Sequence, residues 1–80
     1  MIFQIIRVDC YSGYKRGERP RTFKLNDKKY VVNEIIDRWY EGGVEAQRPI
    51  LNYFKVSTDE GGIFLLRYNP KFDSWAIQIE

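Results

Sequence analysis

The fold is decided by one stretch of the chain: Ile50-Leu-Asn-Tyr-Phe-Lys-Val-Ser-Thr58, then Asp59-Glu-Gly-Gly62, then Ile63-Phe-Leu-Leu-Arg-Tyr68. Residues 50–58 are rich in aromatic and β-branched side chains, which favour strands. Gly61 and Gly62 can adopt the positive φ that a tight hairpin turn requires. Residues 63–68 resume the strand pattern, so the stretch predicts an antiparallel hairpin.

Further strands are expected on both sides of this hairpin. They cover residues 2–8, 22–25, 28–32 and 74–80. The segments between them carry turn and loop signals, at 11–20, 26–27, 42–49 and 69–73. In the last strand, apolar Trp75, Ile77 and Ile79 alternate with the residues between them, which is the period of a half-buried strand.

Residues 33–41 admit two interpretations. Apolar residues recur here at the spacing of one helical face: Val32, Ile35, Ile36 and Trp39. Gly42 and Gly43 would end such a helix. However, the segment continues directly from a strand and has no free N-cap. If the segment is a long, bulged strand, one of its faces carries Val31, Ile35 and Trp39. We favour the strand.

Length, composition and turn spacing together indicate one domain over residues 1–80. Hydrophobic residues make up 44% of the chain and aromatic residues 16%, which supports a small, dense core. Short strands with turns every 8–12 residues are typical of all-β meanders. We predict a small antiparallel meander curled into an SH3-like barrel of about five or six strands. The alternative is an α+β fold, an open antiparallel sheet with one short helix near 33–41.

The composition excludes several classes of function. The chain has no histidine and a single cysteine, Cys10, for which we expect a buried position. It therefore lacks histidine-based catalysis, cysteine-rich metal sites and an internal disulfide. No apolar run approaches the length of a membrane span. We expect a cytoplasmic protein that is not an enzyme, with no cofactor, no metal and no membrane partner.

Positive charge is concentrated in residues 15–29, which hold seven basic and two acidic side chains. Such a segment attracts polyanions, and tyrosine rings nearby can stack on nucleobases. The candidate residues for phosphate contacts are Arg16, Arg19 and Arg21. The candidates for base stacking are Tyr14 and Tyr40. The alternative is a solvated basic loop without a ligand.

A second group of candidate residues is Asp37, Arg38 and Trp39, followed by Tyr40. Tryptophan and arginine are frequent in the energetically dominant parts of interfaces, so these residues predict an interaction surface. The alternative is that Trp39 belongs to the core and that Asp37 and Arg38 form a local ion pair. The acidic pair at 59–60 is expected to be a solvated turn.

A resemblance runs from residue 17 to residue 75. Its segments are Gly-Glu-Arg-Pro-Arg-Thr-Phe at 17–23, Tyr-Val-Val-Asn-Glu-Ile-Ile-Asp-Arg-Trp-Tyr at 30–40, Tyr-Phe-Lys-Val at 53–56, Asp-Glu-Gly-Gly-Ile-Phe-Leu-Leu-Arg at 59–67 and Asp-Ser-Trp at 73–75. Together they resemble a group of small uncharacterised bacterial domains. Similar segments accompany proteins related to Y-family, damage-tolerant DNA polymerases. The resemblance implies a strand at 37–40 and favours a role near nucleic acid, and it assigns no residue a role.

Two functional hypotheses follow. The first is a small non-enzymatic binding module that contacts nucleic acid, or a nucleic-acid-processing protein, through the basic loop and aromatic surface. The alternative is a protein–protein interaction or regulatory domain that does not bind nucleic acid. The modest net charge of +2 favours the alternative, whereas the basic segment at 15–29 favours the first.

Overall fold

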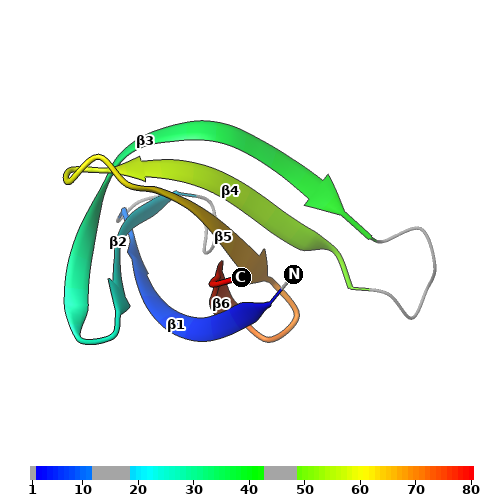
Figure 1. The fold of residues 1–80 in the computed structure, drawn as a ribbon. Helices are drawn as coiled ribbons and strands as arrows, with labels where there is room; N and C mark the ends of the chain where they lie inside the picture. The colour runs from blue at the N-terminus through cyan, green and yellow to red at the C-terminus, as the bar shows by residue number, and fades with distance from the viewer. Residues whose placement is uncertain (1, 12–18, 43–48) are drawn as a thin grey trace.

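The computed structural model describes residues 2–11, 19–42 and 49–80, which form a sheet of antiparallel strands (Figure 1). The strands are β1 (Phe3–Cys10), β2 (Pro20–Leu25), β3 (Lys28–Glu41), β4 (Leu51–Thr58), β5 (Ile63–Asn69) and β6 (Ser74–Gln78). Each strand pairs with the next, and β1 also pairs with β6, so the sheet closes into a barrel. The predicted all-β meander is confirmed. The alternative with a helix near 33–41 is wrong, because that segment belongs to β3.

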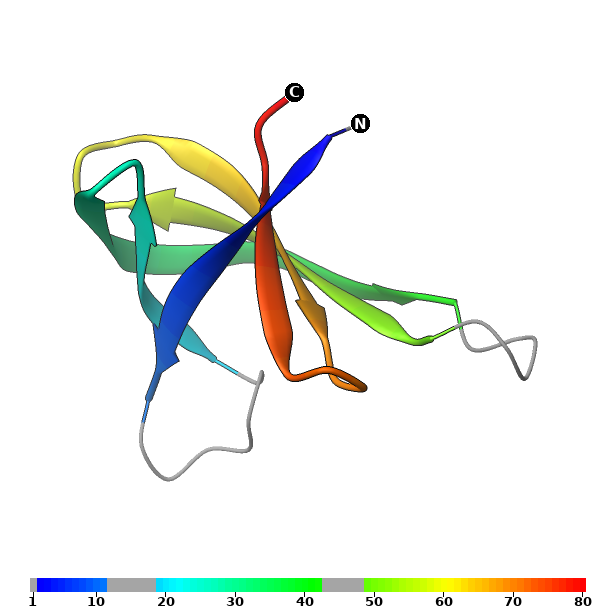
Figure 2. The ribbon, with the colours of Figure 1, turned by 90° about the horizontal axis from the view of Figure 1, so that it is seen from below.

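The strand bounds differ from the predicted ones mostly by one or two residues. The largest difference is β3, which runs without interruption over the 14 residues 28–41 and joins two segments that the sequence analysis treats separately. In addition, β2 begins at Pro20, which was predicted to end a loop. The pairing of β3 with β4 extends to Glu41 opposite Leu51, so β4 holds the second half of β3 in the extended conformation. Figure 2 shows this paired arm reaching beyond the rest of the barrel.

Two bulges in β3 change which of its side chains face the core. The register against β4 shifts between Val32 and Glu34 and again between Ile35 and Asp37. A bulge adds an unpaired residue and resets the alternation of side chains along the strand. Val32 and Ile35 therefore both pack against the core, whereas Val31 is 41% exposed. The predicted common face of Val31, Ile35 and Trp39 is wrong for this reason.

The core lies inside the barrel, where inward-facing side chains of β4, β5 and β6 meet those of β2. Its buried members are Phe23, Phe54, Val56, Leu66, Tyr68, Trp75 and Ile77. Of the three residues in the predicted alternation, Trp75 and Ile77 are core residues, whereas Ile79 lies beyond β6 and is exposed. Cys10 is partly buried and packs against this core, close to what the sequence analysis expected.

The ends of the chain meet at the seam between β1 and β6. The Ile2 N–H donates to the Glu80 carbonyl oxygen at 3.0 Å, and the Ile79 N–H donates to the Ile2 carbonyl oxygen at 2.9 Å. These bonds extend the β1–β6 ladder past Gln78, and the two termini lie side by side in Figure 2. Among the described residues, no helix is long and apolar enough to cross a membrane.

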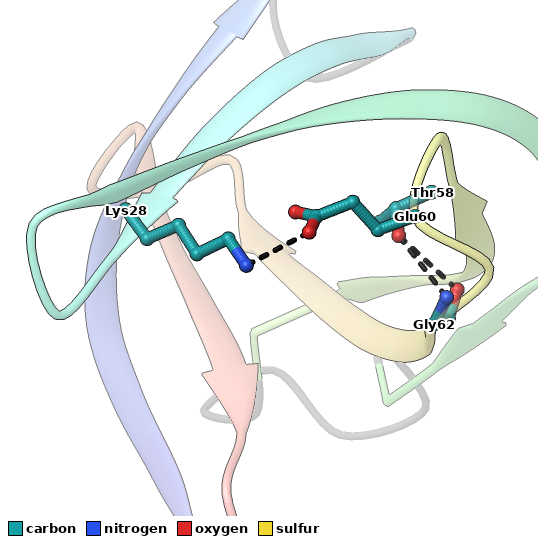
Figure 3. Close-up of polar contacts among 4 residues, drawn as sticks. All are labelled: Lys28, Thr58, Glu60 and Gly62. Atoms are coloured by element: carbon teal, nitrogen blue, oxygen red, sulfur yellow. Dashed lines mark hydrogen bonds and ion pairs between the residues drawn. The ribbon is translucent and has the colours of Figure 1, made fainter.

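Two hairpin turns are fastened to each other by an ion pair. Asn26 and Asp27 have φ of 51° and 65°, the conformation of the tight turn that matches strand twist. The next residue, Lys28, places its Nζ 2.9 Å from Glu60 Oε1 in the β4–β5 turn (Figure 3). In that turn, the Gly62 N–H donates to Thr58 Oγ1 at 3.2 Å. The predicted turn at residues 59–62 is confirmed.

The Lys28–Glu60 ion pair makes the stability of the folded state depend on pH. Glu60 raises the pKa of Lys28 above its ordinary value of 10.5, through a hydrogen bond and Coulombic attraction. The protonated lysine is thus favoured in the folded state, so its stabilising effect is complete below pH 10.5 and is lost as the pH rises through the raised pKa. A double-mutant cycle of Lys28→Gln and Glu60→Gln should show favourable coupling near neutral pH that disappears in strong alkali. The cycle cancels tyrosine ionisation, and coupling that persists unchanged in strong alkali would contradict this assignment.

Candidate functional site

Strands β2 and β3 diverge at one end of the barrel. Their pairing ends where Thr22 lies opposite Val31. The first residue of β2, Pro20, has no backbone N–H to donate to a neighbouring strand. On the other side, β3 turns away at its first bulge. The divergence leaves a hollow of about 440 Å³ lined by Tyr11, Arg19 and Pro20 and, from β3, by Val32, Asn33, Glu34, Ile35 and Arg38. We call it the β2–β3 hollow.

One side of the hollow carries two arginines placed around a tyrosine ring. The guanidinium carbon of Arg19 lies 5.8 Å from the centre of the Tyr11 ring, and that of Arg21 lies 5.6 Å from it. The Tyr11 N–H also donates to the Arg19 carbonyl oxygen at 3.2 Å, which fixes the two chain segments beside each other. Cation–π attraction of this kind holds guanidinium groups in a restricted region. Arg19 and Arg21 therefore lie together beside Tyr11, and their role in phosphate contacts stays a prediction.

The aromatic residue at this position is Tyr11, which the sequence analysis did not select. It chose Tyr14 and Arg16 from the same loop, and both lie outside the described residues. Tyr11 belongs to the same basic and aromatic segment, which runs to Arg21. Its place at the end of β1, opposite the start of β2, follows from strand pairing that a single sequence does not show.

The other side of the hollow carries Arg38, which reaches it from the edge of the core. Its guanidinium carbon lies 4.9 Å from the Phe54 ring centre and 5.6 Å from the Tyr40 ring centre. Its Nη2 donates a hydrogen bond to Tyr40 Oη at 3.0 Å. Tyr40 itself is 60% exposed. The arrangement places a positioned cation and an accessible aromatic ring next to each other.

The structure divides the predicted interaction surface between two faces of β3. Arg38 and Tyr40 share one face, because side chains alternate along a strand. Trp39 lies on the opposite face, where its ring stacks on Tyr53 with centroids 5.3 Å apart and planes 3° apart. Trp39 is partly buried by this stacking but is not part of the main core cluster. Asp37, Arg38 and Trp39 therefore do not form one surface.

Asp37 has a local structural role at the second bulge. Its Oδ1 accepts a hydrogen bond from the Arg38 N–H at 2.7 Å. The register against β4 shifts immediately before this residue. A side-chain acceptor thus satisfies a backbone donor where the ladder is disrupted. This hydrogen bond helps to set the orientation from which Arg38 enters the hollow.

The hollow has a mixed but mainly basic lining. Arg19 and Arg38 contribute two positive charges, Arg21 adds a third beside it, and Glu34 contributes one negative charge. Within the described ranges, no three histidine, cysteine or carboxylate residues gather in a way that would hold a metal ion. The arrangement suits an anion that also presents a flat ring. In comparisons with known proteins, no family model, no curated protein and no solved structure matches the chain.

The hydrogen bond at the second bulge predicts the effect of changing Asp37. Asp37→Ala removes the acceptor for the Arg38 N–H and should lower the free energy of unfolding by about 1 kcal/mol. Asp37→Asn keeps an acceptor oxygen at this position and should retain most of the stability. Urea denaturation of both variants measures the difference. Equal stability of Asp37→Ala and the wild type would contradict the role assigned to this bond.

Proposed function

We propose that this chain is a non-enzymatic module that binds single-stranded nucleic acid at the β2–β3 hollow. One observation carries the proposal: Arg19 and Arg38 come from separate parts of the sequence and line the same hollow. An accessible tyrosine accompanies each of them, Tyr11 at 42% and Tyr40 at 60% exposure. Sites that bind single strands without sequence preference combine these two features, because cations contact the phosphates while aromatic rings stack on the bases.

The contacts within the site support this proposal energetically. The guanidinium groups already lie over tyrosine rings or hydrogen-bond to them, so less side-chain freedom is lost when a phosphate binds. Exposed tyrosine rings offer faces to bases of any kind, and such stacking contributes about 1–3 kcal/mol per base. The Glu34 carboxylate lines the same hollow and repels an anionic ligand. Binding therefore depends on the arginines outweighing one carboxylate, which makes it sensitive to salt.

The arginines beside Tyr11 provide the first test of the proposal. Arg19→Gln combined with Arg21→Gln should weaken binding of a short oligothymidylate, because two cations that neutralise phosphates are removed. The slope of log affinity against log salt should fall by about 0.7 for each arginine replaced. Fluorescence anisotropy at about 50 and about 200 mM salt measures both quantities. The matched control is Lys55→Gln with Lys71→Gln, which removes the same charge from exposed positions elsewhere. Equal affinities of the two double variants would refute the site.

Glu34 provides a test in the opposite direction. Glu34→Gln removes the negative charge from the hollow while keeping a side chain of nearly the same shape. We expect tighter binding of the same oligothymidylate, with the largest gain at low salt, because screening weakens the repulsion at high salt. Glu41→Gln serves as the control, since Glu41 is exposed on the same strand and does not line this hollow. Weaker binding by Glu34→Gln would show that the carboxylate contacts the ligand directly.

A second candidate function, a protein–protein contact, is favoured by the outer face of the barrel. Trp39, Tyr53 and Arg67 occupy one cross-strand row on this face. Arg67 also lies 4.0 Å from the centre of the Phe3 ring. Beyond this row a hollow of about 330 Å³ is lined in part by Ile5 and Phe72, which are 70% and 69% exposed.

An arginine among exposed apolar side chains is typical of protein interfaces. Pull-down from cell extract, with and without nuclease, separates the two functions. Partners that are retained after nuclease treatment and no longer captured by Phe72→Glu would favour the protein interface. Partners that disappear on nuclease treatment would favour nucleic acid.

A further inference from the structure

Three cations form a single row across the outer face of β1, β2 and β3. Arg7 lies directly opposite Lys24, and Lys24 lies directly opposite Lys29. Directly opposed residues in antiparallel strands point to the same side of the sheet, with their Cβ atoms about 4.5–5.5 Å apart. All three side chains are exposed. Strand register therefore aligns three positive charges at the spacing of neighbouring strands.

This row is unfavourable for the stability of the barrel by itself. Like charges placed directly opposite each other destabilise a sheet. Within the described ranges, none of the three cations forms an ion pair, whereas the neighbouring Lys28 is paired with Glu60. A basic surface that served only for solubility would not need three cations in one register. A local conflict of this kind in an otherwise consistent sheet is expected at functional sites.

The surroundings of the row suit an extended anion. A shallow hollow of about 270 Å³ borders it, lined by the three cations together with Phe23, Asp9 and Thr22. Asp9 is the nearest carboxylate along β1, and its Oδ2 accepts a hydrogen bond from Thr22 Oγ1 at 3.4 Å. That bond holds the carboxylate toward β2, two residue pairs away from the row.

We propose that Arg7, Lys24 and Lys29 bind the phosphates of a single-stranded nucleic acid that continues from the β2–β3 hollow. This inference rests on the proposed function. Lys24 follows Arg21 by three residues on β2, which corresponds to about 10 Å along a strand. A single-stranded nucleic acid bound at the hollow can therefore reach the row within a few nucleotides. The row adds phosphate contacts on the outer face to those in the hollow, so it favours longer ligands.

The length of the ligand distinguishes the row from the hollow. Lys24→Gln combined with Lys29→Gln should leave binding of an oligothymidylate of about four nucleotides unchanged and weaken binding of one of about twelve. For the longer ligand the salt slope should fall by about 0.7 for each lysine removed. Lys55→Gln with Lys71→Gln is again the matched control. If the two double variants bind the longer oligonucleotide equally, the inference about the row is wrong while the proposed function stands.

Other outcomes would overturn the proposed function or the separate role of the row. If the wild type binds neither oligonucleotide, both the proposed function and the row as a nucleic-acid site are overturned. If Lys24→Gln with Lys29→Gln weakens the short ligand as much as the long one, the row is not a separate extension and the inference fails. Amide chemical shifts with the longer ligand should change at residues 7, 24 and 29 as well as 11, 19 and 21. Changes confined to the second set would also overturn the row.

A stability measurement tests the electrostatic basis of the inference without a ligand. Lys24 stands between the other two cations, so Lys24→Gln should raise the melting temperature at low salt. The gain should shrink as salt screens the repulsion. Lys55→Gln, which removes a charge from β4, provides the control. An unchanged melting temperature in Lys24→Gln at low salt would remove the argument that the row is strained.

Discussion

The two bulges in β3 are the constraint on which the presentation of this surface depends. They let Val32 and Ile35 both face the core, although the two are three residues apart. Beyond the second bulge, regular alternation puts Arg38 and Tyr40 on the face of the hollow and Trp39 on the opposite face. Loss of one bulge alone would exchange the positions of Arg38 and Trp39, because each bulge shifts the alternation by one residue. The hollow thus lies beside local irregularities of the ladder, the bulges of β3 and the register shift between Asp9 and Cys10.

Closure of the barrel holds the bulged strand β3 in a rigid sheet. The β1–β6 ladder removes the free sheet edges that a short chain would otherwise present. Inside, inward-facing rows such as Phe54, Leu66 and Ile77 fill the core, and Arg38 lies at the end of this row over the Phe54 ring. The cation is therefore positioned by the core itself. At the other end of β3, the Lys28–Glu60 ion pair joins the β2–β3 turn to the β4–β5 turn. Hydrogen bonds within each hairpin do not make this connection.

Charge in this protein is arranged in two different ways. Lys28 is paired with a carboxylate and serves the fold. By contrast, the guanidinium groups around the β2–β3 hollow lie over aromatic rings, and the row of Arg7, Lys24 and Lys29 consists of adjacent like charges. Aromatic contact attracts a cation to the face of the ring and so restricts its position. The two proposed sites therefore share a physical principle, the presentation of clustered cations on a small rigid sheet.

Much of the fold could be predicted from local patterns. Turn residues such as Gly61 and the Asn26-Asp27 pair marked the hairpins, and alternation in residues 74–80 identified Trp75 and Ile77 as core. The segment 33–41 was harder, because its apolar residues fit helix and strand spacing alike. A resemblance to other sequences also favoured the strand. The resemblance itself stays a prediction. For the candidate site, the sequence indicated Arg19, Arg21, Arg38 and Tyr40 but grouped Arg38 with Trp39.

The sequence by itself determined the strand order, the turns and the supply of cations and tyrosines, because these depend on residues close together in the chain. Only the tertiary structure decided that 33–41 is extended, since its partner β4 lies across an intervening loop. It alone placed the bulges that turn both Val32 and Ile35 toward the core. It alone brought Tyr11 and Arg19 opposite Arg38, and it aligned Arg7, Lys24 and Lys29 in one row. Pairing between distant strands sets these neighbours, and no local spacing encodes such register.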